Sequence, residues 1–385
     1  MGEITLSSRL DSVSESATLA LNARVKQLAS EGKTIHNLTA GELAGDTPSY
    51  IQEYVSKHLA LNKYTPVAGM AELREKLADH ARNFYGLDWI NRDNVIITSG
   101  AKPALYGALL ALINPGDEVI VPTPEWVSYN HLIELAGGKV IEVPLTSSYD
   151  IDSNLVEQKL SSKTKAIILN SPHNPTGAVF SESSLKELAT VLNDKDIMVI
   201  SDDIYSKLVY SDNFFMVPSA DFKNLLIVNG FSKSQAITGW RIGYAIGDTK
   251  VIKGMTSLIS HIMGNASVPA QLAAIAALEH DDQPPKETID TLKKQRKIVC
   301  DELNKIPEIK YHPPEGAFYV FLDLRQITSS SIEWCENLLN ETGVALVPGE
   351  AFEAPGFARL TFVCEEETLK KALQLLSDFI KKGSK

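Results

Sequence analysis

The stretch LLIVNGFSKSQAITGWRIG, residues 225–243, decides the fold. It begins with an uninterrupted apolar run, Leu225–Val228, which is typical of a strand covered on both faces in a mostly parallel sheet. Polar residues follow, including Ser232, Lys233 and, further on, Arg241. Ligands bind beyond the carboxyl ends of such strands. An amine, a hydroxyl and a guanidinium in that place suit a cofactor that carries both an aldehyde and a phosphate.

Similar apolar runs precede this stretch, and helical patterns lie between them. The predicted strands are 94–98, 118–121, 139–143, 166–169 and 197–200. The predicted helices include 71–84, an apolar helix after Lys102, and 183–192. Strands that alternate with helices indicate an α/β architecture with a mostly parallel sheet.

The pattern changes near residue 285. A long charged amphipathic helix, 287–303, is followed by a strand-like segment, 317–322, and by a final helix, 366–382. We therefore expect two domains, the second smaller than the first. The predicted division is an N-terminal segment 1–47 that packs with the small domain, a large domain 48–285 and a small C-terminal domain 286–385.

Composition narrows the class of protein. A chain of 385 residues with 44% hydrophobic residues can bury a large core, and its formal net charge of -11 argues against nucleic acid or an anionic membrane as partner. No apolar run approaches the ~20 residues that span a bilayer, so we expect a cytoplasmic protein. The cysteines at 300, 335 and 364 are widely separated, which favours neither a disulfide framework nor a metal site.

Other predicted strands also end in polar segments. These tails are Ser99–Lys102, Asn170–Gly177 and Ser201–Tyr205. The first opens a helix, and the free N–H groups of a helix start form an anion site suited to a phosphate. In the third tail, Asp202 places a carboxylate at the end of an apolar strand. The alternative interpretation is that Asp202 is a solvated acid in a loop.

Eight motifs in sequence order make the chain resemble a class I aminotransferase of PLP (pyridoxal 5′-phosphate) fold type I, and within that family the bacterial and archaeal aspartate aminotransferases. They are YTPVAG from Tyr64, Gly100–Lys102, PEWVSY around Trp126, NSPHNPTG, SDDIY, FSK, TGWRIGY and Ala358–Leu360. The resemblance implies a large domain with a mostly parallel seven-stranded sheet in an α/β/α sandwich, a smaller α+β domain, PLP as cofactor, and a homodimer with shared active sites.

The resemblance also implies roles for the cofactor residues. Lys233 is the catalytic residue that holds PLP as a Schiff base, and Asp202 faces the pyridine nitrogen, keeping it protonated. Tyr205 and Asn174 hydrogen-bond the ring oxygen, although Asn174 also reads as a turn residue. Trp126 stacks on the ring, with a buried structural tryptophan as the alternative. The phosphate contacts are Gly100, Ala101, Lys102, Ser232, Arg241 and, from the neighbouring subunit, Tyr64.

For the substrate, Arg359 matches the family arginine that grips the α-carboxylate, with a surface salt bridge as the alternative. The backbone of Gly41 would meet the same group, and Trp126 and Asn174 would border the substrate. Lys102, Ser16 and Thr18 resemble the set that meets the distal carboxylate of an acidic amino acid, although Ser16 and Thr18 also read as helix caps.

These assignments predict an aminotransferase that moves the amino group between an acidic L-amino acid, aspartate first, and 2-oxoglutarate by a ping-pong mechanism. An aromatic or alanine aminotransferase is one alternative, and a PLP-dependent carbon–sulfur lyase or cyclopropane-forming synthase is another. A PLP-sensing regulator would need a basic N-terminal domain. The chain departs from the family pattern at Pro103, Glu15 and residues 41–46. The last two border the expected substrate pocket and place strict aspartate preference in doubt.

Overall fold

The computed structural model describes residues 4–10, 17–210, 214–280 and 283–383. Within these residues seven strands form a central sheet in the order β2-β8-β7-β6-β5-β3-β4. They are β2 (Val95–Thr98), β3 (Glu118–Thr123), β4 (Lys139–Pro144), β5 (Thr164–Asn170), β6 (Met198–Asp202), β7 (Leu225–Gly230) and β8 (Gly243–Gly247). The predicted strands are confirmed with small shifts at their ends. β8 was not predicted as a strand, and it runs antiparallel to both β2 and β7.

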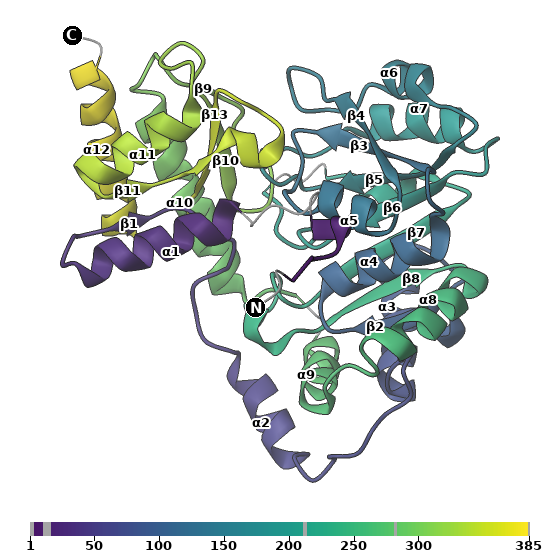
Figure 1. Ribbon diagram of the computed structural model, residues 1–385. Helices are drawn as coiled ribbons and strands as arrows, with labels where there is room; N and C mark the ends of the chain where they lie inside the picture. The colour runs from purple at the N-terminus through teal and green to yellow at the C-terminus, as the bar shows by residue number, and fades with distance from the viewer. Residues whose placement is uncertain (1–3, 11–16, 211–213, 281–282, 384–385) are drawn as a thin grey trace.

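Helices cover both faces of this sheet (Figure 1). One face carries α3 (Ala71–Tyr85), α6 (Ser153–Lys159), α7 (Glu182–Leu192) and α9 (Val268–Glu279), with α2 (Ser49–Lys57) packed on α9. The other carries α4 (Ala101–Leu112), α5 (Tyr129–Leu135) and α8 (Thr249–Ile262). Neighbouring strand residues such as Ile96 and Ile97 enter opposite cores, which is why each strand is apolar throughout.

A smaller α+β domain follows in sequence. Among the described residues, its main sheet has four antiparallel strands in the order β12-β13-β10-β9. The strands are β9 (Lys310–Tyr311), β10 (Tyr319–Asp323), β12 (Val347–Pro348) and β13 (Phe357–Thr361), and the helices are α10 (Lys286–Leu303), α11 (Ser331–Thr342) and α12 (Glu366–Gly383). These elements share a hydrophobic core distinct from the two cores beside the central sheet, and Tyr205 and Leu208 of the large domain also pack into it.

The start of the chain lies against this smaller domain. The two-residue strand β1 (His36–Asn37) pairs in parallel with β11 (Val344–Ala345). Val25 and Leu28 of α1 (Ala17–Ser30) pack on Leu339. The chain then crosses to α2, beside the large domain (Figure 1).

The remaining elements are 3-10 helices: η1 (Ser8–Leu10), η2 (Arg92–Asn94), η3 (Val217–Ala220), η4 (Thr238–Trp240) and η5 (Gly349–Phe352). In the part of the chain described here, no helix combines the length and the apolar character that a bilayer crossing needs.

Candidate active site

A cavity of about 370 Å³ opens at the carboxyl ends of β5 and β6, with walls from both domains. Most residues that the sequence analysis selected line it. They are Gly41, Ala101, Lys102, Trp126, Asn174, Asp202, Tyr205, Ser232, Lys233, Arg241 and Arg359. Residues distant in sequence therefore meet in one place, as expected for side chains that follow the strands of an open α/β sheet.

Asp202 ends β6 and is buried, with 4% of its surface exposed. The hydroxyl of Tyr129 donates to its Oδ2 at 2.7 Å, and the backbone N–H of Ile204 donates to Oδ1 at 3.3 Å. Burial raises the pKa of Asp202 to about 6, while these two donors and the charge of Lys233 oppose the rise. These hydrogen bonds fix the orientation of the Asp202 carboxylate, which can then pair with a positively charged group.

Lys233 follows β7, and its amine donates a hydrogen bond to the backbone oxygen of Gly41. Burial lowers the pKa of this amine to about 8. The charges of Arg359 and Arg241 lower it further, while Glu42 and Asp202 act in the opposite direction. A lysine with a pKa near neutrality can exist as the free amine that nucleophilic chemistry requires.

The start of α4 faces the cavity. Gly100 precedes the helix with φ 107°, and among the described residues no side chain caps it. A Cβ on Gly100 would lie 2.6 Å from Nη2 of Arg241, so only glycine allows the guanidinium to lie over this helix start. Uncapped N–H groups beside an arginine and the nearby Ser232 make a site for an anion.

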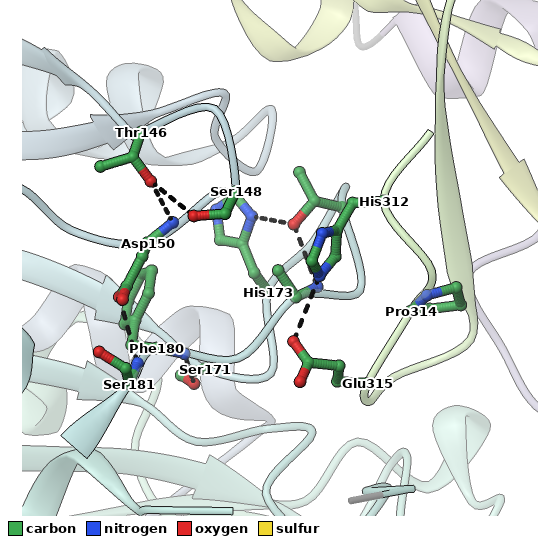
Figure 2. Close-up of polar contacts among 12 residues, drawn as sticks. Thr146, Ser148, Asp150, Ser171, His173, Phe180, Ser181, His312, Pro314 and Glu315 are labelled. Carbon is green, nitrogen blue, oxygen red and sulfur yellow. Dashed lines mark hydrogen bonds and ion pairs between the residues drawn. The ribbon is translucent and has the colours of Figure 1, made fainter. Parts of the chain in front are cut away.

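The loop 171–180 carries Asn174 and is held by hydrogen bonds within it and from the smaller domain; Figure 2 shows His173, Ser171 and Phe180 of this loop. His173 bonds Oγ1 of Thr176 at 2.8 Å, and the backbone N–H of Phe180 donates to Oγ of Ser171 at 3.1 Å. Burial lowers the pKa of His173 to about 3, so the ring is neutral. From the smaller domain, the backbone N–H of Glu315 donates to the oxygen of Gly177 at 2.7 Å. The loop is therefore rigid where the domains meet.

Arg359 lies on β13 of the smaller domain with 4% of its surface exposed. Its Nη1 donates to Oδ1 of Asn174 at 2.9 Å, and its Nη2 donates to the oxygen of Thr39 at 3.0 Å. Its Nε has no hydrogen-bond partner within the described residues, and no described acidic side chain pairs with it. Within the described residues the guanidinium is a buried cation without an acidic partner, which corrects the alternative interpretation of a surface salt bridge.

Trp126 and Lys102 form the side of the cavity next to α4. Nζ of Lys102 lies 4.8 Å from the centroid of the Trp126 ring and 3.0 Å from Oγ of Ser128. The Trp126 ring meets the Tyr129 ring edge-on, with 5.3 Å between centroids. An ammonium and an aromatic face are thus presented to the same space.

Of the other predicted residues, Gly100 and Tyr64 do not line the cavity. Gly100 lies directly beside it, through its contact with Arg241. Tyr64 lies on the loop between α2 and α3 with 98% of its surface exposed. Thr18 is in the first turn of α1, and Ser16 lies outside the described residues.

Eight lining residues were not selected from the sequence, and two of them, Tyr129 and Tyr319, place a phenol hydroxyl against a selected residue. Tyr129 stands three positions after Trp126 in the quoted motif PEWVSY, but the motif does not show that its hydroxyl reaches Asp202. Tyr319 lies at the start of β10, where its position in an apolar strand gave no sign of a polar contact.

Comparison with known proteins places this geometry in a family. The family described as Aminotransferase class I and II matches residues 33–376. The chain belongs to this family. An aspartate aminotransferase of Thermotoga maritima is 40% identical over 381 residues, which cover 97% of this chain and 99% of that protein. An aspartate/prephenate aminotransferase of Thermus thermophilus is 38% identical, covering 96% of this chain and 97% of that protein.

A solved structure supports the same assignment. The aspartate aminotransferase from Thermus thermophilus with maleate matches with a TM-score of 0.94 and 38% identity, over 98% of this chain and 100% of that chain. This aminotransferase thus has the type I fold expected from the sequence, and it is a transaminase similar to the aspartate aminotransferases. The enzymes of this family use PLP and act on amino and oxo acids.

Proposed function

We propose that this aminotransferase binds PLP and moves an amino group between an acidic L-amino acid, with aspartate as first candidate, and 2-oxoglutarate. One observation carries the proposal: the buried guanidinium of Arg359 shares a cavity with Lys233 and has no acidic partner in the described residues. A substrate carboxylate would supply the missing charge next to the reactive amine. The names of the relatives support aspartate as the donor.

The cavity residues fit PLP. When bound, PLP supplies an aldehyde that joins an amine and a ring that accepts the electron pair left when the substrate Cα loses its proton. Lys233 would provide the amine, and Asp202, held by Tyr129, would keep the ring nitrogen protonated. Trp126 would cover the ring face, while Tyr205 and Asn174 would donate to the ring oxygen.

The other end of the cofactor would lie at the start of α4. The phosphate would accept from the backbone N–H groups of Gly100, Ala101 and Lys102 and from the side chains of Ser232 and Arg241. The close approach of Arg241 to Gly100 supports this assignment, because it brings a positive charge to the uncapped helix start.

The substrate would be held at both ends. Arg359, with the backbone of Gly41, would bind the α-carboxylate, and a charge-assisted contact of this kind contributes roughly 1.5–3 kcal/mol. Lys102, with Ser16 and Thr18, would meet the distal carboxylate. The ammonium of Lys102 is fixed by Ser128 beside Trp126, which supports a site for a second negative charge.

Lys233 would also carry the proton. As a free amine, its Nζ would take the proton from the substrate Cα and hold it for return to the reacting group. A pKa of about 8 suits both halves of this transfer near neutral pH. The reaction is then ping-pong: one oxo acid leaves before 2-oxoglutarate enters and reverses the steps.

The proposal extends to a cytoplasmic homodimer with shared active sites. Tyr64 would reach the phosphate in the neighbouring subunit. Its exposed ring stands in a loop with exposed Leu59 and Leu61, and an apolar patch of this kind suits an interface. We retain the division into an N-terminal segment 1–47, a large domain 48–285 and a small domain 286–385 as part of the proposal.

Prephenate is a second candidate for the oxo acid. The Thermus thermophilus relative is named for both aspartate and prephenate. The altered segment 41–46, which borders the cavity through Gly41, supports a substrate range broader than aspartate alone.

Two measurements test the proposal. The purified protein loaded with PLP is incubated with a panel of amino donors and 2-oxoglutarate, and glutamate and ammonia are both measured. We expect glutamate with aspartate as donor; ammonia without glutamate would indicate a lyase instead. Lys233→Ala should keep the fold but lose the visible band of the loaded enzyme and nearly all turnover. Turnover like that of the wild type would refute the role of Lys233.

A further inference from the structure

Tyr319 is a buried polar side chain that the proposed function does not use. It starts β10 with 1% of its surface exposed, and it lines the cavity from the smaller domain. Its position is tightly set: a Cβ on Gly41 would lie 3.2 Å from its hydroxyl, and a Cβ on Gly177 would lie 2.6 Å from its backbone oxygen. Both neighbours are glycines, so the tyrosine fits where larger side chains would displace it.

The hydroxyl of Tyr319 lies 2.9 Å from the hydroxyl of Tyr205. Burial raises the pKa of both phenols, so both keep their protons near neutral pH. A phenol has one proton to donate. When Tyr205 donates its proton to an oxygen in the cavity, it must accept from Tyr319, and this second bond polarises the first.

The ring of Tyr319 meets Arg359. In the antiparallel register of β10 and β13, Tyr319 pairs with Thr361 and Phe321 pairs with Arg359, so Tyr319 and Arg359 are diagonal neighbours on one face. Cζ of Arg359 lies 4.5 Å from the Tyr319 ring centroid and 4.9 Å from that of Phe352 on η5. The two aromatic rings hold a cation that lacks an acidic partner among the described residues.

These contacts link Tyr319, Tyr205, Asn174 and Arg359 in a closed ring of interactions. Arg359 donates to Asn174, and Nδ2 of Asn174 lies 3.5 Å from the Tyr205 hydroxyl, so Asn174 joins the same two residues by another route. We propose that Tyr319 is a positioning residue that fixes the donor direction of Tyr205 through its hydroxyl and the plane of Arg359 through its ring. This inference rests on the proposed function, in which Tyr205 meets the cofactor and Arg359 meets the substrate.

The two contacts are separable by substitution. Tyr319→Phe keeps the ring and removes the hydroxyl, whereas Tyr319→Leu removes both. Tyr210→Phe is a matched control, because its hydroxyl, on a half-buried side chain, donates to the backbone oxygen of Ala317 in the same segment but does not line the cavity. Each protein is loaded with PLP. Its visible absorption is then titrated with pH, and its affinity for maleate, a dicarboxylate without an amino group, is measured.

For Tyr319→Phe we expect the midpoint of the titration to rise by about 0.5–1 pH unit. Tyr205 becomes a weaker donor to the ring oxygen of the cofactor, so this oxygen keeps more negative charge and the titrating proton beside it is held more tightly. Maleate affinity should stay within about twofold. For Tyr319→Leu we expect maleate to bind about tenfold more weakly, because Arg359 loses one aromatic face. Tyr210→Phe should change neither quantity.

The outcomes are distinguishable. A midpoint for Tyr319→Phe equal to that of the wild type, or maleate binding by Tyr319→Leu equal to that of the wild type, would overturn the inference alone. An equal shift in Tyr210→Phe would also overturn it, since the effect would then be a general loss of packing. A wild-type protein that takes up no PLP would overturn the proposed function and the inference with it.

Discussion

The hydroxyl of Tyr129, at the start of α5, lies 2.7 Å from Oδ2 of Asp202, at the end of β6. The bond joins residues from two layers of the large domain, and both side chains are buried. It lowers the pKa of Asp202 against the larger effect of burial. The ionised state of Asp202 that the proposed function requires therefore depends partly on Tyr129.

Tyr129→Phe should shift the acid limb of activity to higher pH. Loss of a neutral donor of about 1 kcal/mol raises the pKa of Asp202 by roughly 0.5–1 unit. The ionised carboxylate is the active form. When the pH is lowered, the variant would therefore lose activity at a higher pH than the wild type does. The pH profile of kcat/KM for aspartate measures this shift. Tyr106→Phe, on α4, is the control, and equal profiles for all three proteins would contradict the expectation.

Arg359→Lys should weaken substrate binding even though the positive charge is kept. Lysine keeps the charge but loses the planar pair of donors and the contact with the two aromatic rings. We expect kcat/KM for aspartate to fall about 10- to 100-fold. Arg325→Lys is the matched control, because Arg325 also pairs through two nitrogens, with Asp323, but at an exposed site. A similar loss in both variants would argue against a substrate contact.

The predicted fold followed from local signals. The strands were visible because each is buried on both faces and so apolar along its whole length, as in Leu225–Val228. β8 was missed because its short apolar run lies between Gly243 and Gly247, inside a stretch dominated by motif residues. Its antiparallel direction depends on tertiary pairing with β2 and β7, which no local pattern encodes.

Site residues could be predicted where a reactive side chain directly follows a predicted strand, as for Asp202 and Lys233. Tyr129 and Tyr319 were missed because their hydrogen-bond partners lie 73 and 114 residues away, respectively. A tyrosine in an apolar segment reads as core, and only the fold shows that its hydroxyl reaches a polar group. That Arg359 meets no acidic side chain among the described residues is likewise a property of the packed domains, because its hydrogen-bond partners Asn174 and Thr39 are distant in sequence.

Lys102→Ala should lower activity with aspartate much more than activity with alanine. Its ammonium is proposed to meet the distal carboxylate, so kcat/KM for aspartate should fall about 10- to 100-fold, while that for alanine should change by no more than about threefold. Absorbance of the bound cofactor checks that PLP is retained, since the backbone N–H at this position stays in place. Equal losses for both donors would contradict the assignment of the side chain to the distal carboxylate.

Glu125→Gln should stabilise the protein at alkaline pH. Glu125 has 2% of its surface exposed, and its Oε2 has no hydrogen-bond partner among the described residues. Burial, with repulsion from Glu353 and Glu142, raises its pKa from 4.5 to about 9. The folded state therefore binds a proton more tightly than the unfolded state, so the free energy of unfolding falls as the pH rises from 4.5 to 9.

Glutamine cannot ionise, and the variant keeps the backbone bond from residue 125 to the oxygen of Phe352. We expect the free energy of unfolding of the variant to exceed that of the wild type by at least about 1–2 kcal/mol at pH 8. The difference should be small at pH 4.5, where Glu125 is protonated in the folded state and half protonated in the unfolded state. Urea unfolding across this range measures the gap, with Glu134→Gln on exposed α5 surface as control. A gap independent of pH would show that the gain comes from packing, because only a titrating group can make it grow between these two pH values.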